Sequence, residues 1–299
     1  MLSILIPIYN FDCNELVQRL SHQANYNSYE IEIICMDDAS SPEFRVINAG
    51  LKDLPHVKYF QLYSNLGRAH IRNELARVAQ FSYLLFMDCD SMPHDDYYLE
   101  RYTRLLPTEQ IICGGRSYQI ERPDDQRFLL HWTYGTEREQ KDAATRNKTP
   151  HHGFMTNNFL IPKHIMEQFP FDAEIKQYGH EDTLFGFKLK EVGIPIHHID
   201  NQLLHIGLEE RSIFLEKQKK AIENLVELKA QYPELQTRLT QFADKFEGVW
   251  YSWIMRFLLR VLRSKMETDL NADPPSIKAL DMIKMEQYLQ LRRKQKYKS

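Results

Sequence analysis

The first half of the chain alternates short apolar runs with longer segments in which apolar and polar residues mix. The runs predict buried strands because they are short, bounded by polar residues and mostly rich in Ile and Leu. We place strands at residues 2–8, 29–36, 57–62 and 83–87, and helices at 14–23, 42–51 and 68–79. This alternation is typical of βαβ units, so we expect an α/β fold with a mostly parallel central sheet flanked by helices.

Polar residues directly follow three of these strands. The three strand ends are Pro7-Ile8-Tyr9-Asn10, Asp37-Asp38-Ala39-Ser40 and Asp88-Cys89-Asp90. Because crossover connections are right-handed, the carboxyl ends of parallel strands share one edge of the sheet. Open α/β sheets bind their ligands at that edge. Three polar strand ends on one edge therefore indicate a binding site.

The pattern becomes less regular after about residue 110. A strand is expected within 111–120, where Gly114 and Gly115 allow a bulge or a close approach of the backbone. Residues 125–146 predict a helix or a partly ordered excursion. A helix at 182–191 and a strand at 194–199 follow, which extends the α/β pattern to about residue 210.

The last third of the chain has only helical periodicity. A first amphipathic helix is closed by Pro233, a second continues to Phe257, and a third runs from Ser276 into the basic end of the chain. We therefore expect an α/β domain at residues 1–210 and a C-terminal helical extension at 211–299.

Composition narrows the class of protein. Of the 299 residues, 43% are hydrophobic and 26% are charged, as in ordinary globular proteins. The net charge of −3 provides no field for nucleic acid, so no such partner is expected. The four cysteines lack a C-x-x-C pair, which favours a reducing compartment. With no basic leader and no apolar run of about 20 residues, we expect a cytoplasmic protein.

The acidic motif Asp88-Cys89-Asp90 is the most informative feature of the chain. Two carboxylates one residue apart at the end of a buried strand attract a hard divalent cation. Such a cation usually keeps coordination positions open for substrate phosphates. The alternative is an acidic loop that only closes the strand.

The motifs together resemble the inverting family 2 glycosyltransferases of the GT-A fold, over roughly residues 1–207. The other motifs that carry the resemblance are Asn65-Leu66-Gly67, Arg72-Asn73 and Gly179-His180-Glu181-Asp182. The resemblance implies an inverting enzyme of hexosyltransferase type. Its donor would be a nucleoside diphosphate sugar, with a UDP-sugar expected, and its acceptor a glycan or a lipid-linked glycan. The Q-x-x-R-W element of processive synthases is absent, which favours single transfers.

The resemblance also assigns residues to the donor base. It places Asp38 on the nucleotide base, with Pro7 and Tyr9 lining the base pocket. The alternative for Asp37 and Asp38 is a turn that caps the helix beginning near residue 42.

Two arginines are candidates for the donor phosphates. Arg68 and Arg72 lie four residues apart on one helix face, and guanidinium groups suit phosphate oxygens. Arg68 could instead be a solvated surface residue. Arg72 could instead pair with Asp88 or Asp90 and hold the acidic loop.

The resemblance implies a Mn²⁺ or Mg²⁺ ion that bridges the donor diphosphate. Asp90 is the first choice for direct contact with the metal, and Asp88 would contact the ribose or reach the metal through water. His205 stands where a downstream histidine ligand is expected. His197 and His198 are alternatives, and a lone histidine in an apolar run is often a core residue.

The base and the acceptor site are assigned in the same way. Asp182 would remove the proton of the acceptor hydroxyl, and Glu181 would orient the acceptor or its loop. The alternative is that both carboxylates only stabilise a helix N-terminus. Asn157, Asn158 and the Gly114-Gly115 pair are expected to border the sugar and acceptor sites.

The helical extension holds a basic and aromatic segment. Trp250, Tyr251, Trp253 and Phe257 lie close in sequence to several Arg and Lys residues, as in helices at anionic membrane surfaces. Such contact would be peripheral, at the inner face of a membrane. The alternative is packing on the catalytic domain or on a second copy, which would make a homo-oligomer.

Two other classes of function fit parts of the sequence. A nucleotidyltransferase would need a glycine-rich phosphate loop, which residues 7–10 lack. A non-catalytic sugar-nucleotide-binding scaffold would not need both the acidic motif and the Glu181-Asp182 pair.

Overall fold

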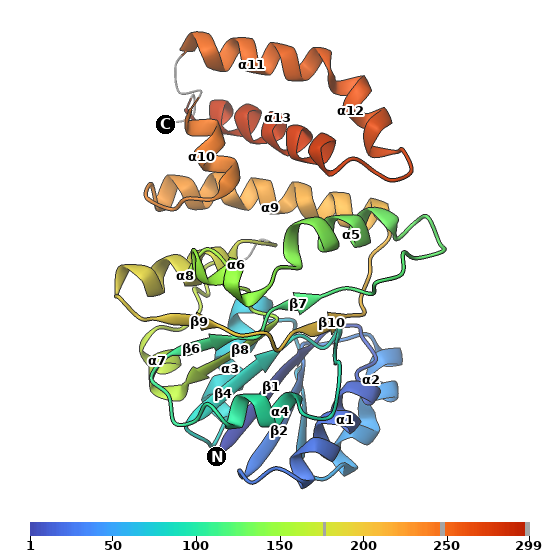
Figure 1. The fold of residues 1–299 in the computed structure, drawn as a ribbon, viewed down its shortest axis with the longest axis vertical. Helices are drawn as coiled ribbons and strands as arrows, with labels where there is room; N and C mark the ends of the chain where they lie inside the picture. The colour runs from blue at the N-terminus through green and yellow to red at the C-terminus, as the bar shows by residue number, and fades with distance from the viewer. Residues whose placement is uncertain (176–177, 246–248, 297–299) are drawn as a thin grey trace. The chain divides into compact units, whose positions relative to one another are not determined.

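The computed structural model describes residues 1–175, 178–245 and 249–296, and its chain forms two compact units (Figure 1). The N-terminal unit comprises Met1–Gln119, Gln140–Lys176 and Glu181–Gly207. The C-terminal unit comprises Ile120–Glu139, Gln177–His180 and Leu208–Ser299. The C-terminal unit thus includes two segments from within the predicted α/β domain.

A seven-stranded sheet forms the centre of the N-terminal unit. Its strands are β1 (Leu2–Ile8), β2 (Ile31–Asp37), β3 (Val57–Gln61), β4 (Tyr83–Met87), β6 (Ile111–Cys113), β8 (Asn158–Pro162) and β9 (Ile196–His198). Their order is β3-β2-β1-β4-β8-β6-β9, and β8 alone is antiparallel to its neighbours. The predicted mostly parallel sheet is confirmed.

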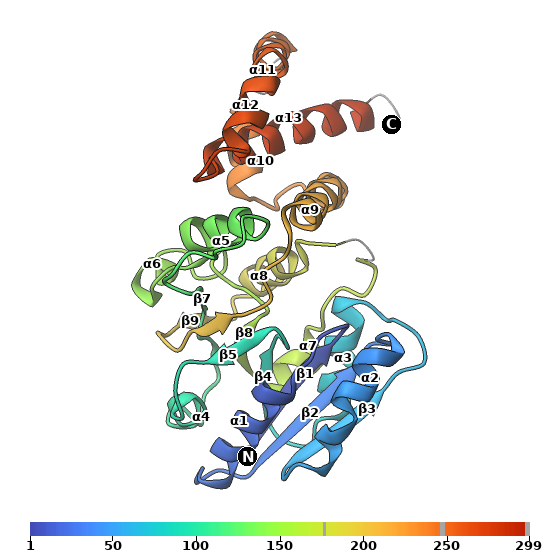
Figure 2. The same cartoon turned by 90° about the vertical axis from the view of Figure 1, so that its right-hand side faces the viewer.

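Helices cover both faces of this sheet (Figure 2). Alternate residues of a strand point to opposite faces, so Ile4 and Ile6 join one core and Leu5 joins the other. Helices α1 (Asn14–Asn25) and α4 (Tyr98–Thr103) contribute to the core of Ile4 and Ile6. Helices α3 (Arg68–Val78), α7 (Lys163–Gln168) and α8 (Glu181–Glu191) contribute to the other.

A small three-stranded sheet lies beside the end of β4. It consists of β5 (Ser91–Pro93), β10 (Leu203–His205) and β7 (Arg116–Ser117), in the order β5-β10-β7. Strand β10 is antiparallel to β5, and His205 pairs with Ser91. This register brings a histidine to the residue that follows Asp90.

One predicted helix is wrong in its continuity, because the helix expected at 42–51 is α2 (Pro42–Asn48) followed by a 3₁₀ turn, Ala49–Asp53. The segment 125–146, expected as a helix or a partly ordered excursion, holds three helical pieces. They are α5 (Leu129–Tyr134), a π-helical turn (Gly135–Glu139) and α6 (Ala143–Asn147). Asp142 accepts a hydrogen bond from the Thr145 amide at 2.7 Å, so a new helix is capped there.

Five helices follow in the C-terminal unit. They are α9 (Arg211–Gln231), α10 (Arg238–Asp244), α11 (Val249–Val261), α12 (Arg263–Leu270) and α13 (Ile277–Lys296). The predicted end of the first helix before Pro233 is confirmed. The prediction of one second helix that continues to Phe257 is wrong, because α10 ends at Asp244 and α11 begins at Val249. Residues 246–248 lie outside the described residues.

Helix α13 holds the C-terminal helices together. It contacts α9, α10, α11 and α12, and Figure 1 shows it between α9 and α11. Over the described parts of the chain, no helix has both the length and the apolar content to cross a membrane.

Candidate active site

Both oxygens of Asp88, at the end of β4, face arginines. Arg72 Nη2 lies 2.8 Å from Asp88 Oδ1, and Arg116 Nη2 lies 3.3 Å from Asp88 Oδ2. The Asp88 amide also donates to the Asn157 carbonyl at 3.2 Å. The alternative in which Arg72 pairs with the acidic motif is therefore what the structure shows. Arg116 was not predicted, and its only signal in the sequence is its place directly after Gly114-Gly115.

Asp90 lies against His205. The Asp90 Oδ1 to His205 Nδ1 distance is 3.6 Å, which is an ion-pair distance longer than an ordinary hydrogen bond. His205 is 4% exposed, and the Ile206 amide donates to the Asp90 carbonyl at 2.9 Å. Burial alone would raise the pKa of Asp90, but His205 and Arg116 outweigh it and hold that pKa well below its ordinary value.

Gly207 closes over the Asp90 carboxylate. A Cβ atom at residue 207 would lie 2.7 Å from Asp90 Cβ and 2.9 Å from Asp90 Oδ2. Real Cβ atoms essentially never approach that closely. A residue without a side chain is therefore required beside the second aspartate of the motif.

Only one of the three candidate histidines lies beside the acidic motif. His198 is instead buried, with Nδ1 2.7 Å from Arg146 Nη1 and Nε2 2.9 Å from the Pro150 carbonyl. Burial, with Arg146 nearby, lowers the pKa of His198 to about 4. His197 is exposed on β9. Of the three candidates, the structure thus brings His205 beside Asp90.

Asp90 and His205 fit a divalent cation. Asp90 Oδ1 is buried and accepts no hydrogen bond from the described residues. Carboxylate oxygen suits Mg²⁺ and Mn²⁺, and a neutral imidazole nitrogen is a common metal ligand in proteins. The described residues contain no cluster of three or more acidic, His or Cys side chains arranged around a metal position. Of the described residues, Asp90 and His205 would thus be two ligands, and an ion held by them would complete its shell with phosphate oxygens and water.

The two aspartates at the end of β2 hold loops at the same edge of the sheet. Asp37 accepts from the Ser40 amide at 2.7 Å and from the Tyr59 hydroxyl at 3.3 Å. Asp38 accepts from the Leu66 amide at 2.6 Å and from the Gly67 amide at 3.0 Å. Asp38 thus fixes the loop that begins α3.

The base-pocket assignments stay predictions. Asp38 is buried and its carboxylate oxygens are used by backbone amides, whereas Tyr9 is 56% exposed and Pro7 is partly buried. The Asp38 amide donates to the Ile8 carbonyl at 2.8 Å, which ties the ends of β1 and β2 together. Burial raises the pKa of Asp38 in spite of the two amide donors.

Helix α3 connects the acidic motif with the second acidic pair. Arg68 Nη1 lies 3.4 Å from Glu181 Oε1, across 113 residues of sequence. Arg72 donates to the Arg68 carbonyl at 3.1 Å while it pairs with Asp88. Arg68 and Arg72, on successive turns of α3, therefore connect Glu181 with Asp88.

The neighbouring carboxylates of Glu181 and Asp182 have opposite pKa shifts. Burial raises the pKa of Asp182 to about 6, and the adjacent charge of Glu181 adds to this. Burial would also raise the pKa of Glu181, but Arg68 and Arg72 outweigh it and lower that pKa. Asp182 accepts from the Thr183 amide at 2.6 Å. Glu181 is thus kept ionised, and Asp182 can exchange a proton near neutral pH.

A family model described as glycosyl transferase family 2 matches residues 3–168, more than half of the chain. The chain belongs to this family. The predicted family and the predicted enzyme class, a glycosyltransferase, are confirmed.

Curated relatives of this glycosyltransferase include a chondroitin synthase and a hyaluronan synthase. It is 23% identical over 237 residues to chondroitin synthase of Escherichia coli, covering 68% of this chain and 34% of that protein. It is 23% identical over 203 residues to hyaluronan synthase of Pasteurella multocida, covering 58% of this chain and 21% of that protein. The chain therefore spans about a third or less of the curated relatives that it matches.

Solved structures share the fold of this glycosyltransferase. Residues 1–349 of S. aureus TarS align with a TM-score of 0.53 and 15% identity, over 100% of this chain and 92% of that one. The mannosyltransferase PcManGT of Pyrobaculum calidifontis aligns with a TM-score of 0.60 and 14% identity, over 98% of this chain and 86% of that one. These similarities confirm the predicted GT-A fold.

The glycine pair of the glycosyltransferase is needed for packing. A Cβ at Gly114 would lie 2.4 Å from Asn158 Nδ2, and one at Gly115, whose φ is +89°, would lie 2.7 Å from Arg146 Cζ. Asn158 itself accepts from two tyrosine hydroxyls and donates to the carbonyls of Gly115 and Asn201. The predicted close approach at Gly114 and Gly115 is confirmed. The buried Asn158 side chain joins β8 to the backbone of residues 115 and 201 by hydrogen bonds.

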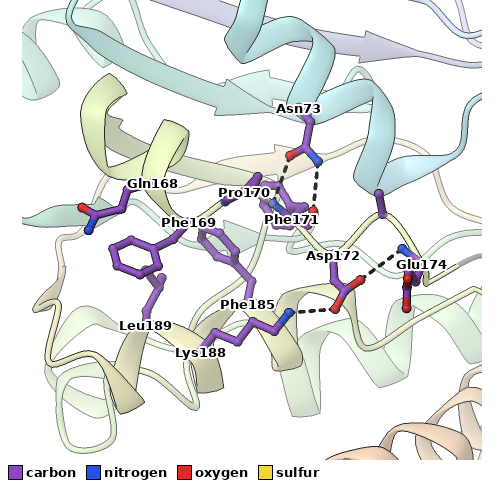
Figure 3. A pocket seen from close by; sticks show the side chains of 11 residues that line it. Asn73, Gln168, Phe169, Pro170, Phe171, Asp172, Glu174, Phe185, Lys188 and Leu189 are labelled. Carbon is purple, nitrogen blue, oxygen red and sulfur yellow. Dashed lines mark hydrogen bonds and ion pairs between the residues drawn. The ribbon is translucent and has the colours of Figure 1, made fainter.

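A cavity of about 530 Å³ lies on the α3 side of the sheet (Figure 3). Asn73, at its edge, donates to the Phe171 carbonyl at 2.9 Å and accepts from the Phe171 amide at 3.0 Å. Lys188 pairs with Asp172 at 2.7 Å. The Phe171 ring lies under the Arg72 guanidinium, 5.9 Å from its centroid. The cavity wall therefore supports Arg72 from below, and none of its lining residues belongs to the acidic motif.

Proposed function

We propose that this protein is a metal-dependent, inverting glycosyltransferase that moves a sugar from a nucleoside diphosphate sugar to an acceptor hydroxyl. The observation that carries the proposal is the Asp90–His205 pair at the carboxyl edge of the sheet. Helix α3 links this edge to Glu181, and the adjacent Asp182 is a carboxylate with a raised pKa. One connected set of side chains therefore includes both the groups that would bind the charged donor and the carboxylate that would accept the proton.

Asp90 and His205 would hold the divalent ion. When bound, the ion, Mn²⁺ or Mg²⁺, would stabilise the charge that develops on the departing nucleoside diphosphate. Asp88 has a different task in this proposal, because both its oxygens are engaged by Arg72 and Arg116. It orients the strand end that carries Asp90, and its 21% exposed side chain leaves room for a ribose contact.

Arg68 is the residue proposed to bind the diphosphate. Its side chain is 52% exposed, and its contact with Glu181 is long at 3.4 Å. A guanidinium group binds phosphate oxygens with two parallel hydrogen bonds, which is a stronger arrangement than a contact of 3.4 Å. Arg72 is 3% exposed and fixed on Asp88, so it supports the site from behind rather than meeting the donor.

Asp182 is proposed as the base. In a single displacement the acceptor oxygen attacks the anomeric carbon, its proton passes to Asp182, and the bond to the diphosphate oxygen breaks. A pKa of about 6 suits this task, because the carboxylate is ionised at neutral pH and still basic enough to take the proton. Glu181 keeps that pKa raised through its adjacent charge.

Donor and acceptor classes are proposed from the relatives. TarS has been solved with UDP and with UDP-GlcNAc, and PcManGT with GDP-Man and Mn²⁺, which supports a nucleoside diphosphate sugar. We place UDP-sugars first. The names of the chondroitin and hyaluronan synthases support a glycan acceptor, free or lipid-linked.

The test is release of UDP from a panel of UDP-sugars in the presence of Mn²⁺, without acceptor. Slow hydrolysis of one donor, lost in Asp182→Asn and after chelation of the metal, is expected. UDP with Mn²⁺ should also raise the melting temperature. Neither hydrolysis nor a UDP-dependent shift with any donor would overturn the proposal, whereas a shift without hydrolysis would indicate a non-catalytic sugar-nucleotide-binding scaffold.

A further inference from the structure

Helix α11 carries a continuous apolar surface. Trp253, Phe257, Leu258, Val261 and Leu262 are each 40% to 63% exposed, within ten residues of sequence. The rings of Trp253 and Phe257 stack, with centroids 5.8 Å apart and planes 13° apart. Successive members at i and i+4 lie one above the other on a helix. Trp253, Phe257 and Val261 therefore form one row along α11, and Leu258 and Leu262, the residue after α11, flank this row. The five side chains are here called the α11 ridge.

The opposite side of α11 packs inside the C-terminal unit. The helix contacts α12 and α13, and Leu259 is only 4% exposed. Figure 1 shows α13 on one side of α11, with α9 beyond it. The C-terminal unit thus supplies the packing partners of one side of α11 and leaves the α11 ridge accessible.

Positive charge borders the ridge. At 100° per residue, Arg256 and Arg260 fall at the edge of the arc that contains Trp253, Phe257 and Val261. Within the described residues, no ion pair includes Arg256, Arg260 or Lys265. The sequence from 249 to 266 contains no Asp or Glu. The surface therefore combines apolar side chains with uncompensated positive charge.

The shape of the surface favours a lipid bilayer. A peptide helix is usually held in a groove, but the α11 ridge stands on a single convex helix. The cavity of about 350 Å³ in the C-terminal unit is lined by other residues, among them Lys219, Glu286 and Gln290. Aromatic and aliphatic side chains with basic residues at their border are what an interfacial helix presents to anionic headgroups and the upper acyl chains.

We propose that the α11 ridge docks the protein on an anionic lipid surface, with Trp253 and Phe257 inserted and Arg256 and Arg260 on the lipid phosphates. Nothing in this inference depends on the proposed donor or base. It places the C-terminal unit at a membrane without a membrane-spanning helix among the described residues.

The test is sedimentation of the full chain with vesicles. Neutral phosphatidylcholine vesicles are compared with vesicles that contain about 30% phosphatidylglycerol, since anionic lipid attracts each surface Lys or Arg. We expect sedimentation with the anionic vesicles only, and its loss at about 0.5 M NaCl because salt screens the attraction. Equal binding to both kinds of vesicle, or to neither, would overturn the proposal.

Two double variants separate the apolar and the charged parts. Trp253→Ser with Phe257→Ser should weaken vesicle binding by about tenfold or more, because apolar area buried in the interface is lost. Arg256→Gln with Arg260→Gln should weaken it by about 25-fold, from about fivefold for each basic residue. Circular dichroism and the melting temperature show that each variant is folded.

Matched controls change the same chemistry elsewhere in the C-terminal unit. Ile213→Ser removes an apolar side chain that is 50% exposed on α9, and Arg238→Gln with Lys278→Gln removes two exposed charges. Both should leave vesicle binding within about twofold of the parent protein. A second copy is the competing occupant of the ridge. A dimer that the Trp253 and Phe257 changes convert to a monomer, with vesicle binding unaltered, would refute the lipid assignment.

Discussion

Arg72 Nη2 lies 2.8 Å from Asp88 Oδ1, and this pair joins the buried side of helix α3 to the end of strand β4. The guanidinium is 3% exposed and also donates to the Arg68 carbonyl. Arg116 reaches the other Asp88 oxygen at 3.3 Å. The first aspartate of the acidic motif is therefore a structural anchor for the second.

Replacing Arg72 tests this anchor. Arg72→Met leaves the Asp88 carboxylate with one partner, so we expect the free energy of unfolding to fall by about 2 to 3 kcal/mol, just below the range for fully buried pairs. Urea denaturation measures it. Arg77→Met is the matched control, because its pair with Glu74 on the same helix is exposed and worth under about 1 kcal/mol. Similar losses in both variants would contradict the anchoring role.

Asp90→Asn tests the metal site. The amide is a weaker ligand than a carboxylate, so the Mn²⁺-dependent increase in melting temperature with UDP should disappear, together with turnover. Asp96→Asn changes an exposed aspartate between β5 and α4 and should keep both. If the Asn variant still responds to Mn²⁺ like the parent protein, Asp90 is not a ligand.

Gly207→Ala tests the contact over Asp90. The new Cβ would lie 2.7 Å from Asp90 Cβ, so the carboxylate or the loop must move. Misplacement of a reacting group by about 1 Å can cost about 100-fold in rate, and we expect a loss of at least tenfold. Gly50→Ala is the control, because a Cβ there meets nothing within 4 Å. Equal activity of both variants would show that the site tolerates the displacement.

The pKa of Asp182 sets the pH dependence of transfer. A base must be ionised, so the rate should fall about tenfold per pH unit below a pH of about 6. Glu181→Gln removes the neighbouring charge, lowers the pKa of Asp182 and should move this limb to lower pH. Asp182→Asn should keep donor binding and lose about 100- to 10,000-fold in rate. An unchanged acid limb in Glu181→Gln would assign the titration to another group.

Asp182→Asn should also raise the free energy of unfolding at high pH and leave it unchanged at low pH. A carboxyl whose pKa is raised in the folded state stabilises the fold at low pH, and this stability is lost as pH rises toward about 6. At pH 8 the Asn variant avoids the buried charge, and we expect it to be about 1 to 3 kcal/mol more stable than the parent protein. Below about pH 4 the difference should vanish. Urea titrations at the two pH values measure both.

The elements of the N-terminal unit follow from local pattern. The strands at residues 2–8 and 83–87 coincide with their predicted bounds because continuous apolar runs can be satisfied only by burial in a covered sheet. The position of Asp37 and Asp88 at strand ends follows from the same pattern. The break before α6 was not predicted from the sequence. The Asp142 side chain caps α6 by accepting a hydrogen bond from the Thr145 amide, and hydrophobic periodicity carries no information about such a bond.

The sequence by itself determined the family, the alternation of strands and helices up to residue 87, and the edge of the sheet to which its acidic residues would come. Only the tertiary structure decided that Asp88 is held by Arg72 and Arg116, that His205 rather than His198 lies beside Asp90, and that Arg68 meets Glu181 across 113 residues. The physical reason is range. Strand and helix formation depends on neighbouring residues, whereas charge pairing depends on which distant side chains the packed core brings within a few ångströms.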